Sequence, residues 1–244
     1  MRDYAKETEA RVAFLRKALD DAHAKGIVYG NSGGKDSALV GILCKKACDN
    51  VLGVLMPCQS SRNFGEDMDD GKKLAEQFHI ETVTVDLSQV KTELVGAVGK
   101  AAEVTDAAKS NIAPRLRMAT LYAIAQSRGC IVAGTGNKCE AFMGYFTKWG
   151  DGAYDINPIA DLTVTEIYEF LEYLQAPENI IKKAPSAGLF EGQTDESEMG
   201  VTYRQIEEVM ATGTTADKAA AEKILQTNQK TEHKRRMPLS YAQE

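Results

Sequence analysis

The stretch best suited to chemistry is YGNSGGKDSALVG, residues 29–41, which follows a short apolar run and leads into a helix-compatible segment. Its adjacent glycines, Gly33 and Gly34, let the backbone turn tightly and bring N–H groups against an anion, and the following helix presents its positive end. Hydroxyl and ammonium side chains add further donors. The stretch therefore predicts a phosphate-binding loop. Its expected binding residues are Gly30, Asn31, Ser32, Gly33, Gly34, Lys35, Asp36 and Ser37.

The same loop carries a carboxylate, Asp36, next to its lysine. A negative side chain repels a phosphate unless a divalent cation lies between them, so Asp36 is expected to bind magnesium. The loop is not a Walker A motif, because Tyr29 stands where the first glycine would be, and its glycines lack the spacing of the dinucleotide fingerprint. The simpler alternative is a Gly-rich turn in which Asp36 only faces the positive helix end.

The elements that must position this loop alternate along the chain. Apolar periodicity predicts a helix over residues 3–24, and β-prone runs at 27–30, 51–56, 82–86 and 130–134 are separated by helix-length segments. Such alternation predicts an α/β fold: a parallel, twisted sheet of about five strands with helices on both faces. In such sheets ligands bind beyond the carboxyl ends of the strands, which is where the loop lies.

Later helices have clear start signals. Thr163-x-x-Glu166 and Thr202-x-x-Gln205 are capping boxes, and Pro114 is expected in the first turn of its helix. Residues 184–200 show no periodicity, and a loop of that length is expected to cover a substrate. The predicted helices after the first strand cover residues 36–49, 66–79, 88–103, 113–128, 163–174, 202–210 and 215–229.

Composition excludes several classes of protein. The chain has 244 residues, 43% of them hydrophobic and 26% charged, which is typical of one globular α/β domain. No apolar run is long enough to span a membrane and the amino terminus does not resemble a signal peptide, so a cytoplasmic location is expected. The net charge of −6 argues against a general nucleic-acid binder. The five cysteines form no Cys-x-x-Cys pair and are expected to be reduced.

Ser-Gly-Gly-x-Asp-Ser resembles the PP-loop of the ATP pyrophosphatases, which implies a Rossmann-like fold and transfer of AMP to an acceptor with release of pyrophosphate. Residues 134–163 closely resemble the corresponding segment of the ammonia-dependent NAD synthetases. Three further segments agree in order: NIAPRLRM at 111–118, APSAGLFEGQTDESEMGVTY at 184–203 and TEHKRRMP at 231–238. Residues 1–244 are thus expected to form a single NAD synthetase domain without the glutaminase domain of the family's other form.

The resemblance implies a two-step ligase reaction at the end of NAD biosynthesis. The carboxylate of deamido-NAD attacks the α-phosphorus of ATP to give an NAD-adenylate, and ammonia then displaces AMP to form NAD. Asp36 and Glu140 match the family's magnesium ligands, while Thr135 and Ser186 match ATP contacts. From the residues alone, a solvated helix charge is the favoured interpretation of Glu140, and a cap or turn role is favoured for the two hydroxyls.

A second set of residues matches positions that hold deamido-NAD: Arg115, Lys148, Asp155, His233 and Lys234. Without the resemblance, most of them would be interpreted as surface charges. Asp151 is a weaker candidate for orienting ammonia or accepting its proton, with a role in the Gly-rich turn as the alternative. In the family this substrate site lies between two subunits, so the resemblance also implies a homodimer.

One position departs from the family. Many members have a lysine that reaches ATP where this chain has Val164, and Lys35 stands in the loop where relatives often have an uncharged residue. We hypothesise that Lys35 supplies the missing charge.

Two other functions share parts of this pattern. A tRNA-modifying adenylating enzyme would require RNA-binding basicity and, for thiolation, usually a cysteine pair, whereas this chain is acidic. A nucleotide sensor that does not turn over ATP would not require two magnesium-binding carboxylates.

Overall fold

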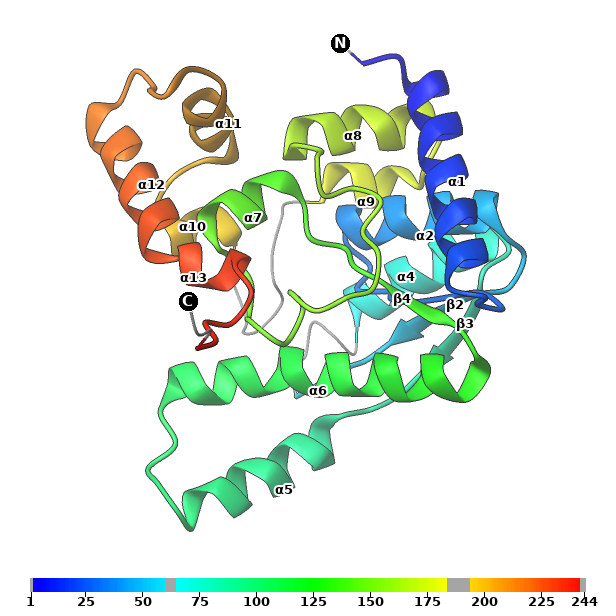
Figure 1. The fold of residues 1–244 in the computed structure, drawn as a ribbon, viewed down its shortest axis with the longest axis horizontal. Coiled ribbons are helices and arrows are strands. Elements are labelled where there is room, and N and C mark those ends of the chain that lie inside the picture. The colour runs from blue at the N-terminus through cyan, green and yellow to red at the C-terminus, as the bar shows by residue number, and fades with distance from the viewer. Residues whose placement is uncertain (1, 60–64, 184–193, 242–244) are drawn as a thin grey trace.

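The computed structural model describes residues 2–59, 65–183 and 194–241. Its sheet contains four parallel strands in the order β3-β2-β1-β4 (Figure 1). The strands are β1 (Ile27–Gly30), β2 (Val51–Leu55), β3 (Glu81–Thr84) and β4 (Ile131–Ala133). All four begin within one residue of the predicted runs.

The prediction of about five strands was wrong, because the next segment makes only one parallel bridge, between Ala133 and Ile156. Next to it, the backbone N–H of Ile156 donates to the Val132 carbonyl at 3.2 Å, and that of Gly134 donates to the Ile156 carbonyl at 2.8 Å. Pairing stops there because Pro158 has no N–H to donate. The segment around Ile156 therefore lies along the edge of β4 but does not form a fifth strand.

The predicted helices are present, one of them with an earlier start, and residues 138–143, 178–182, 195–199 and 232–235 form short helices that were not predicted. Helix α6 begins at Asp106 rather than at residue 113, because the Thr105 hydroxyl caps it by accepting the Ala108 N–H at 3.2 Å. Pro114 consequently lies inside the helix, and its predicted place in the first turn was wrong. The helices are α1 (Tyr4–Asp21), α2 (Lys35–Ala47), α4 (Glu66–Gln77), α5 (Ser88–Gly99), α6 (Asp106–Arg128), α7 (Lys138–Met143), α8 (Val164–Tyr173), α9 (Glu178–Lys182), α10 (Asp195–Met199), α11 (Tyr203–Thr212), α12 (Lys218–Lys230) and α13 (Glu232–Arg235).

Helices cover both faces of the sheet, as predicted. Side chains alternate along a strand, so Ile27 and Tyr29 of β1 enter a core formed with α1, α2 and α8, whereas Val28 enters the core on the α6 side. Figure 1 shows α6 and α5 on one side of the sheet and α2 and α8 on the other. Strand β1, whose first three residues are buried, thereby places the loop that follows it at the carboxyl edge of the sheet.

A second cluster of helices lies beside the sheet, where α7, α11 and α12 pack around Ile206, Val209 and Ile224. Both predicted capping boxes are present, at the starts of α8 and α11. Residues 184–193 of the predicted loop lie outside the described residues, and its later part contains α10 rather than only loop. All five cysteines are free, as expected. None of the described helices combines the length and apolar character that crossing a membrane requires.

Candidate active site

A cavity of ≈ 650 Å³ opens beyond the carboxyl ends of β1, β2 and β4. Gly30, Met56 and Gly134, at or just beyond the ends of these strands, line it. This is the position expected for a ligand site in a parallel sheet, and the volume is typical of small-molecule sites. The cavity is therefore the candidate active site.

The predicted phosphate loop forms one wall. Gly33 has a φ of 71°, and its N–H donates to Asn31 Oδ1 at 3.2 Å. The Gly34 N–H donates to Ser32 Oγ at 3.3 Å, and no side chain caps α2. Because no side chain caps α2, the N–H groups of its first turn remain available to an anion.

Most of the predicted loop residues face the cavity. Gly33 and Ser37 are not among the described residues that line it, since Ser37 Oγ lies behind the loop, 3.0 Å from both Ser32 Oγ and the Gly34 carbonyl. Thr135, from the loop after β4, also lines the cavity. Ser186 lies outside the described residues. The loop residues that line the cavity are Gly30, Asn31, Ser32, Gly34, Lys35 and Asp36.

Asp36 and Glu140 meet at the same wall, as their predicted role requires. Asn137 joins them: its Nδ2 donates to Asp36 Oδ1 at 3.1 Å, and its backbone N–H donates to Glu140 Oε2 at 2.9 Å. Lys35 Nζ donates to Asp36 Oδ2 at 2.7 Å. Burial, and then the negative charge of Asp36, raise the pKa of Glu140 well above its ordinary value.

The two carboxylates suit magnesium. A divalent cation between them would relieve the repulsion that raises the pKa of Glu140. Over the described ranges, no group of three or more His, Cys, Asp or Glu side chains is arranged to hold a metal. Magnesium commonly uses one or two carboxylates and takes its other ligands from phosphates and water. The residues therefore fit an ion that is bound together with a nucleotide.

The loop that carries Thr135 is supported by residues 156–162. Asn157 Nδ2 donates to the Gly136 carbonyl at 2.8 Å, and the Lys138 N–H donates to the Leu162 carbonyl at 2.9 Å. These contacts hold both ends of the loop that positions Asn137. A movement of residues 156–162 would therefore displace Asn137 and change the positions of Asp36 and Glu140.

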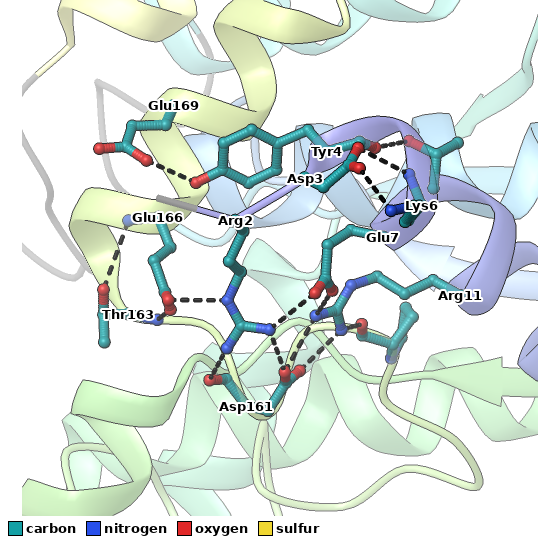
Figure 2. Close-up of polar contacts among 12 residues, drawn as sticks. Arg2, Asp3, Tyr4, Lys6, Glu7, Arg11, Asp161, Thr163, Glu166 and Glu169 are labelled. Atoms are coloured by element: carbon teal, nitrogen blue, oxygen red, sulfur yellow. Dashed lines mark hydrogen bonds and ion pairs between the residues drawn. The ribbon is translucent and has the colours of Figure 1, made fainter.

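The amino-terminal helix fixes residues 156–162 in turn (Figure 2). Arg11 donates to both carboxylate oxygens of Asp161, at 2.6 and 2.9 Å, and to the Pro158 carbonyl at 2.5 Å. Arg2 approaches Asp161 at 3.1 Å and Glu166 at 2.7 Å. The hydrogen bond from Arg11 is the main cause of the lowered pKa of Asp161. Helix α1 thus supports a cavity wall that it does not line.

The far end of the cavity carries Asp151 and Lys234. Asp151 Oδ1 accepts the Thr147 N–H at 2.9 Å, while Lys234 Nζ donates to the Gly144 and Phe146 carbonyls at 2.7 and 2.8 Å. Desolvation by the surrounding protein raises the pKa of Asp151, against the effect of that N–H bond. Asp151 is therefore a stronger proton acceptor than an ordinary aspartate.

Three of the remaining predicted residues gather outside the cavity lining. Arg115 Nη2 donates to the Lys148 carbonyl at 3.3 Å, and Lys148 Nζ donates to the His233 carbonyl at 2.6 Å. Asp155 uses both oxygens elsewhere, accepting the Tyr122 hydroxyl at 3.1 Å and the Val132 N–H at 2.7 Å. These four predicted contacts with deamido-NAD stay predictions.

Sequence reasoning missed several cavity residues, including Arg117, Lys183 and Asn137. Arg117 stands two positions after Arg115, which on a helix is a rotation of roughly 200°, so it faces the cavity while Arg115 is exposed. The segment NIAPRLRM offered two arginines on opposite faces of the predicted helix, and the sequence did not indicate which of them meets the cavity. Asn137 had a signal too, as the first residue of an Asn-x-x-Glu capping box.

Comparison with known proteins gives one family. A family model described as NAD synthase matches residues 7–238. A relative from Carboxydothermus hydrogenoformans, named NH(3)-dependent NAD(+) synthetase, is 44% identical over 97% of both chains. A relative of the same name from Finegoldia magna is 40% identical over 98% of this chain and 97% of its own.

Solved structures agree with this result. An NMN synthetase from Francisella tularensis superposes with a TM-score of 0.93 at 36% identity, over 99% of both chains. An NH3-dependent NAD synthetase from Campylobacter jejuni has a TM-score of 0.80 at 31% identity, over 99% of this chain and 100% of that one.

Proposed function

This chain belongs to the NAD synthase family and makes NAD from ammonia in an ATP-driven reaction, and we propose that it does so through an adenylate of deamido-NAD. The observation that carries this mechanism is the pairing of Asp36 and Glu140 beside the phosphate loop in one cavity. Loop N–H groups and a divalent cation on two carboxylates suit a triphosphate whose outer part departs as pyrophosphate.

The proposed reaction has two steps. A carboxylate oxygen of deamido-NAD forms a bond to the α-phosphorus of ATP, and pyrophosphate leaves with the electrons of the broken P–O bond. Ammonia then attacks the carbonyl carbon, the C–O bond breaks, and AMP leaves with that oxygen. Magnesium, held by Asp36 and Glu140, would offset the charge that develops on the phosphates.

The second step needs neutral ammonia, so a group must accept a proton from ammonium. We propose Asp151, because it lines the cavity and its raised pKa makes it the stronger acceptor. The oxygen that does not bind the Thr147 N–H is the one available for this role. Thr135 and the loop would bind ATP, and Lys234 would bind the anionic part of deamido-NAD.

We also propose that the protein acts as a homodimer. Helix α5 has no buried residue, and Val90, Leu94 and Val98 form an exposed apolar stripe along it, with exposures of 48%, 39% and 38%. A second copy of this chain would cover the stripe. Arg115 and Lys148 could then contact substrate at the subunit interface, which would explain why they lie outside the cavity lining of one chain.

The dimer is tested by light scattering after size-exclusion chromatography. We expect Leu94→Asp to shift the mass toward one chain and Gln89→Asp, which adds the same charge to an exposed residue of the same helix, to leave it unchanged. Equal masses for the two variants would contradict an interface at α5.

We further propose that residues 1–244 form one NAD synthetase domain and that the reaction takes place in the cytoplasm, as the last step of NAD biosynthesis. The free thiols of the described cysteines are compatible with a reducing compartment.

A second candidate substrate follows from the similarity to an NMN synthetase. The corresponding reaction would amidate nicotinate mononucleotide, which carries the same carboxylate on a smaller body. We test both with purified protein, ATP, magnesium and ammonium, and compare kcat/KM for the two acids. We expect NAD and AMP in equal amounts and a preference for deamido-NAD. Preference for the mononucleotide would move the assignment to NMN synthesis, and AMP formed only with tRNA would refute both.

A further inference from the structure

Lys35 is buried at the active site, with only 5% of the residue exposed. It is the first residue of α2, and its ammonium lies 2.7 Å from Asp36 Oδ2 and 5.6 Å from the ring centroid of Tyr203. Lysine is rarely buried to this extent without a partner, because removing the ammonium from water is costly. The contacts with Asp36 and Tyr203 therefore offset the cost of burying this cation.

The contacts keep Lys35 charged. Burial disfavours the charged form of a lysine, but the Asp36 carboxylate at 2.7 Å stabilises the ammonium. Without this ammonium, two carboxylates would face one another across Asn137, and no other side chain within residues 2–59, 65–183 and 194–241 places a positive charge at bonding distance from Asp36. Lys35 thus acts as the counter-ion of the pair.

Lys35 and a divalent cation compete for the carboxylate oxygens of Asp36. Oδ1 accepts from Asn137 and Oδ2 accepts from Lys35, so a cation that binds Asp36 must displace or weaken one of these bonds. The lysine is the partner with freedom to move, because its flexible four-carbon stem starts at the edge of the phosphate loop. The Asn137 side chain is also the cap of α7 and is fixed there.

We propose that Lys35 is an internal counter-ion. Before the nucleotide binds, its ammonium pairs with the Asp36 carboxylate; when Asp36 binds magnesium, the ammonium moves and pairs with the triphosphate instead. This inference rests on the proposed function. It also accounts for Val164, which is 4% exposed and packs in the same apolar cluster as Tyr203. Where many family members have a lysine that reaches ATP, this chain has a buried valine, and Lys35 of α2 supplies the positive charge.

The test measures metal binding without turnover. Mn²⁺ is titrated into the nucleotide-free protein and the free ion is followed by electron paramagnetic resonance. We expect Lys35→Met to bind Mn²⁺ about tenfold more tightly than wild type, because an adjacent opposite charge changes the cation affinity of a carboxylate by that order or more. Lys46→Met, which removes an exposed lysine from the same helix, is the matched control and should not change the affinity.

The second arm measures nucleotide binding. With magnesium present, we expect Lys35→Met to bind α,β-methylene-ATP about tenfold more weakly, since it loses a cation for the triphosphate. Unchanged Mn²⁺ affinity or unchanged nucleotide affinity overturns the counter-ion role. Lys35→Gln, which keeps a donor for Asp36 but no charge, serves if the methionine variant does not fold. NAD formation by wild type on the same preparation reports separately on the proposed function.

Discussion

Gly33→Ala is expected to damage both the fold and the phosphate loop. At a φ of 71° an alanine costs about 1–2 kcal/mol relative to glycine. Its Cβ would lie 2.0 Å from the Asp67 carbonyl oxygen, where ordinary contact begins at 3.4 Å. The start of α4 would have to retreat, against the ion pair at 2.7 Å between Asp67 and Lys183. Overpacking of this kind costs about 1–3 kcal/mol.

The total loss in the free energy of unfolding is thus about 2–5 kcal/mol, a large part of a typical domain's stability. Urea denaturation measures it, and titration with α,β-methylene-ATP should show weaker nucleotide binding. Gly96→Ala is the matched control: a Cβ there meets nothing within 4 Å on helix α5, so we expect a gain of about 0.5–1 kcal/mol. If Gly33→Ala unfolded at the wild-type urea concentration and bound the nucleotide normally, the loop geometry described above would be refuted.

Three further substitutions have defined outcomes. Tyr29→Phe removes a fully buried hydroxyl that has no hydrogen-bond partner among the described residues, and should raise the free energy of unfolding by about 1 kcal/mol in urea; a decrease would contradict its isolation. Asp161→Asn should raise the KM for ATP by loosening residues 156–162. Because the pKa of Asp161 is lowered, its stabilisation exists above the unfolded pKa and is lost as pH falls through the folded value, so the difference in Tm between wild type and variant should shrink from pH 7 to pH 3. Asp151→Asn should slow NAD formation while a burst of pyrophosphate persists; loss of the burst would place Asp151 in the first step instead.

The arrangement of the sheet could be predicted because it depends on local patterns. Each β-prone run is short and followed by a helix-length segment, and Ile27, Val28 and Tyr29 of β1 are buried on both faces, as a central strand requires. The prediction of about five strands failed, because one proline, Pro158, decides whether an edge segment pairs beyond a single bridge. Whether an edge segment counts as a strand depends on its pairing with the neighbouring strand, which local sequence patterns do not determine.

The site was predicted where a residue's role depends on its own motif, and less well where it depends on helix phase. Asp36 and Glu140 come together because each follows a strand end, which the order of motifs implies. Arg117 faces the cavity and Arg115 is exposed because they lie on opposite faces of α6, and the local sequence does not indicate which face meets the cavity. The ion pair between Lys35 and Asp36 joins neighbours in sequence, yet it forms only because folding buries both.

The central claim is that the acceptor carboxylate is activated by AMP transfer, and an isotope measurement tests it most directly. Deamido-NAD labelled with ¹⁸O in its nicotinate carboxylate is converted in the presence of ATP, magnesium and ammonium, and the products are separated and analysed by mass spectrometry. We expect one ¹⁸O atom in AMP for each NAD formed, and none in pyrophosphate. Label in inorganic phosphate or pyrophosphate, or AMP without label, would contradict adenylation at this site.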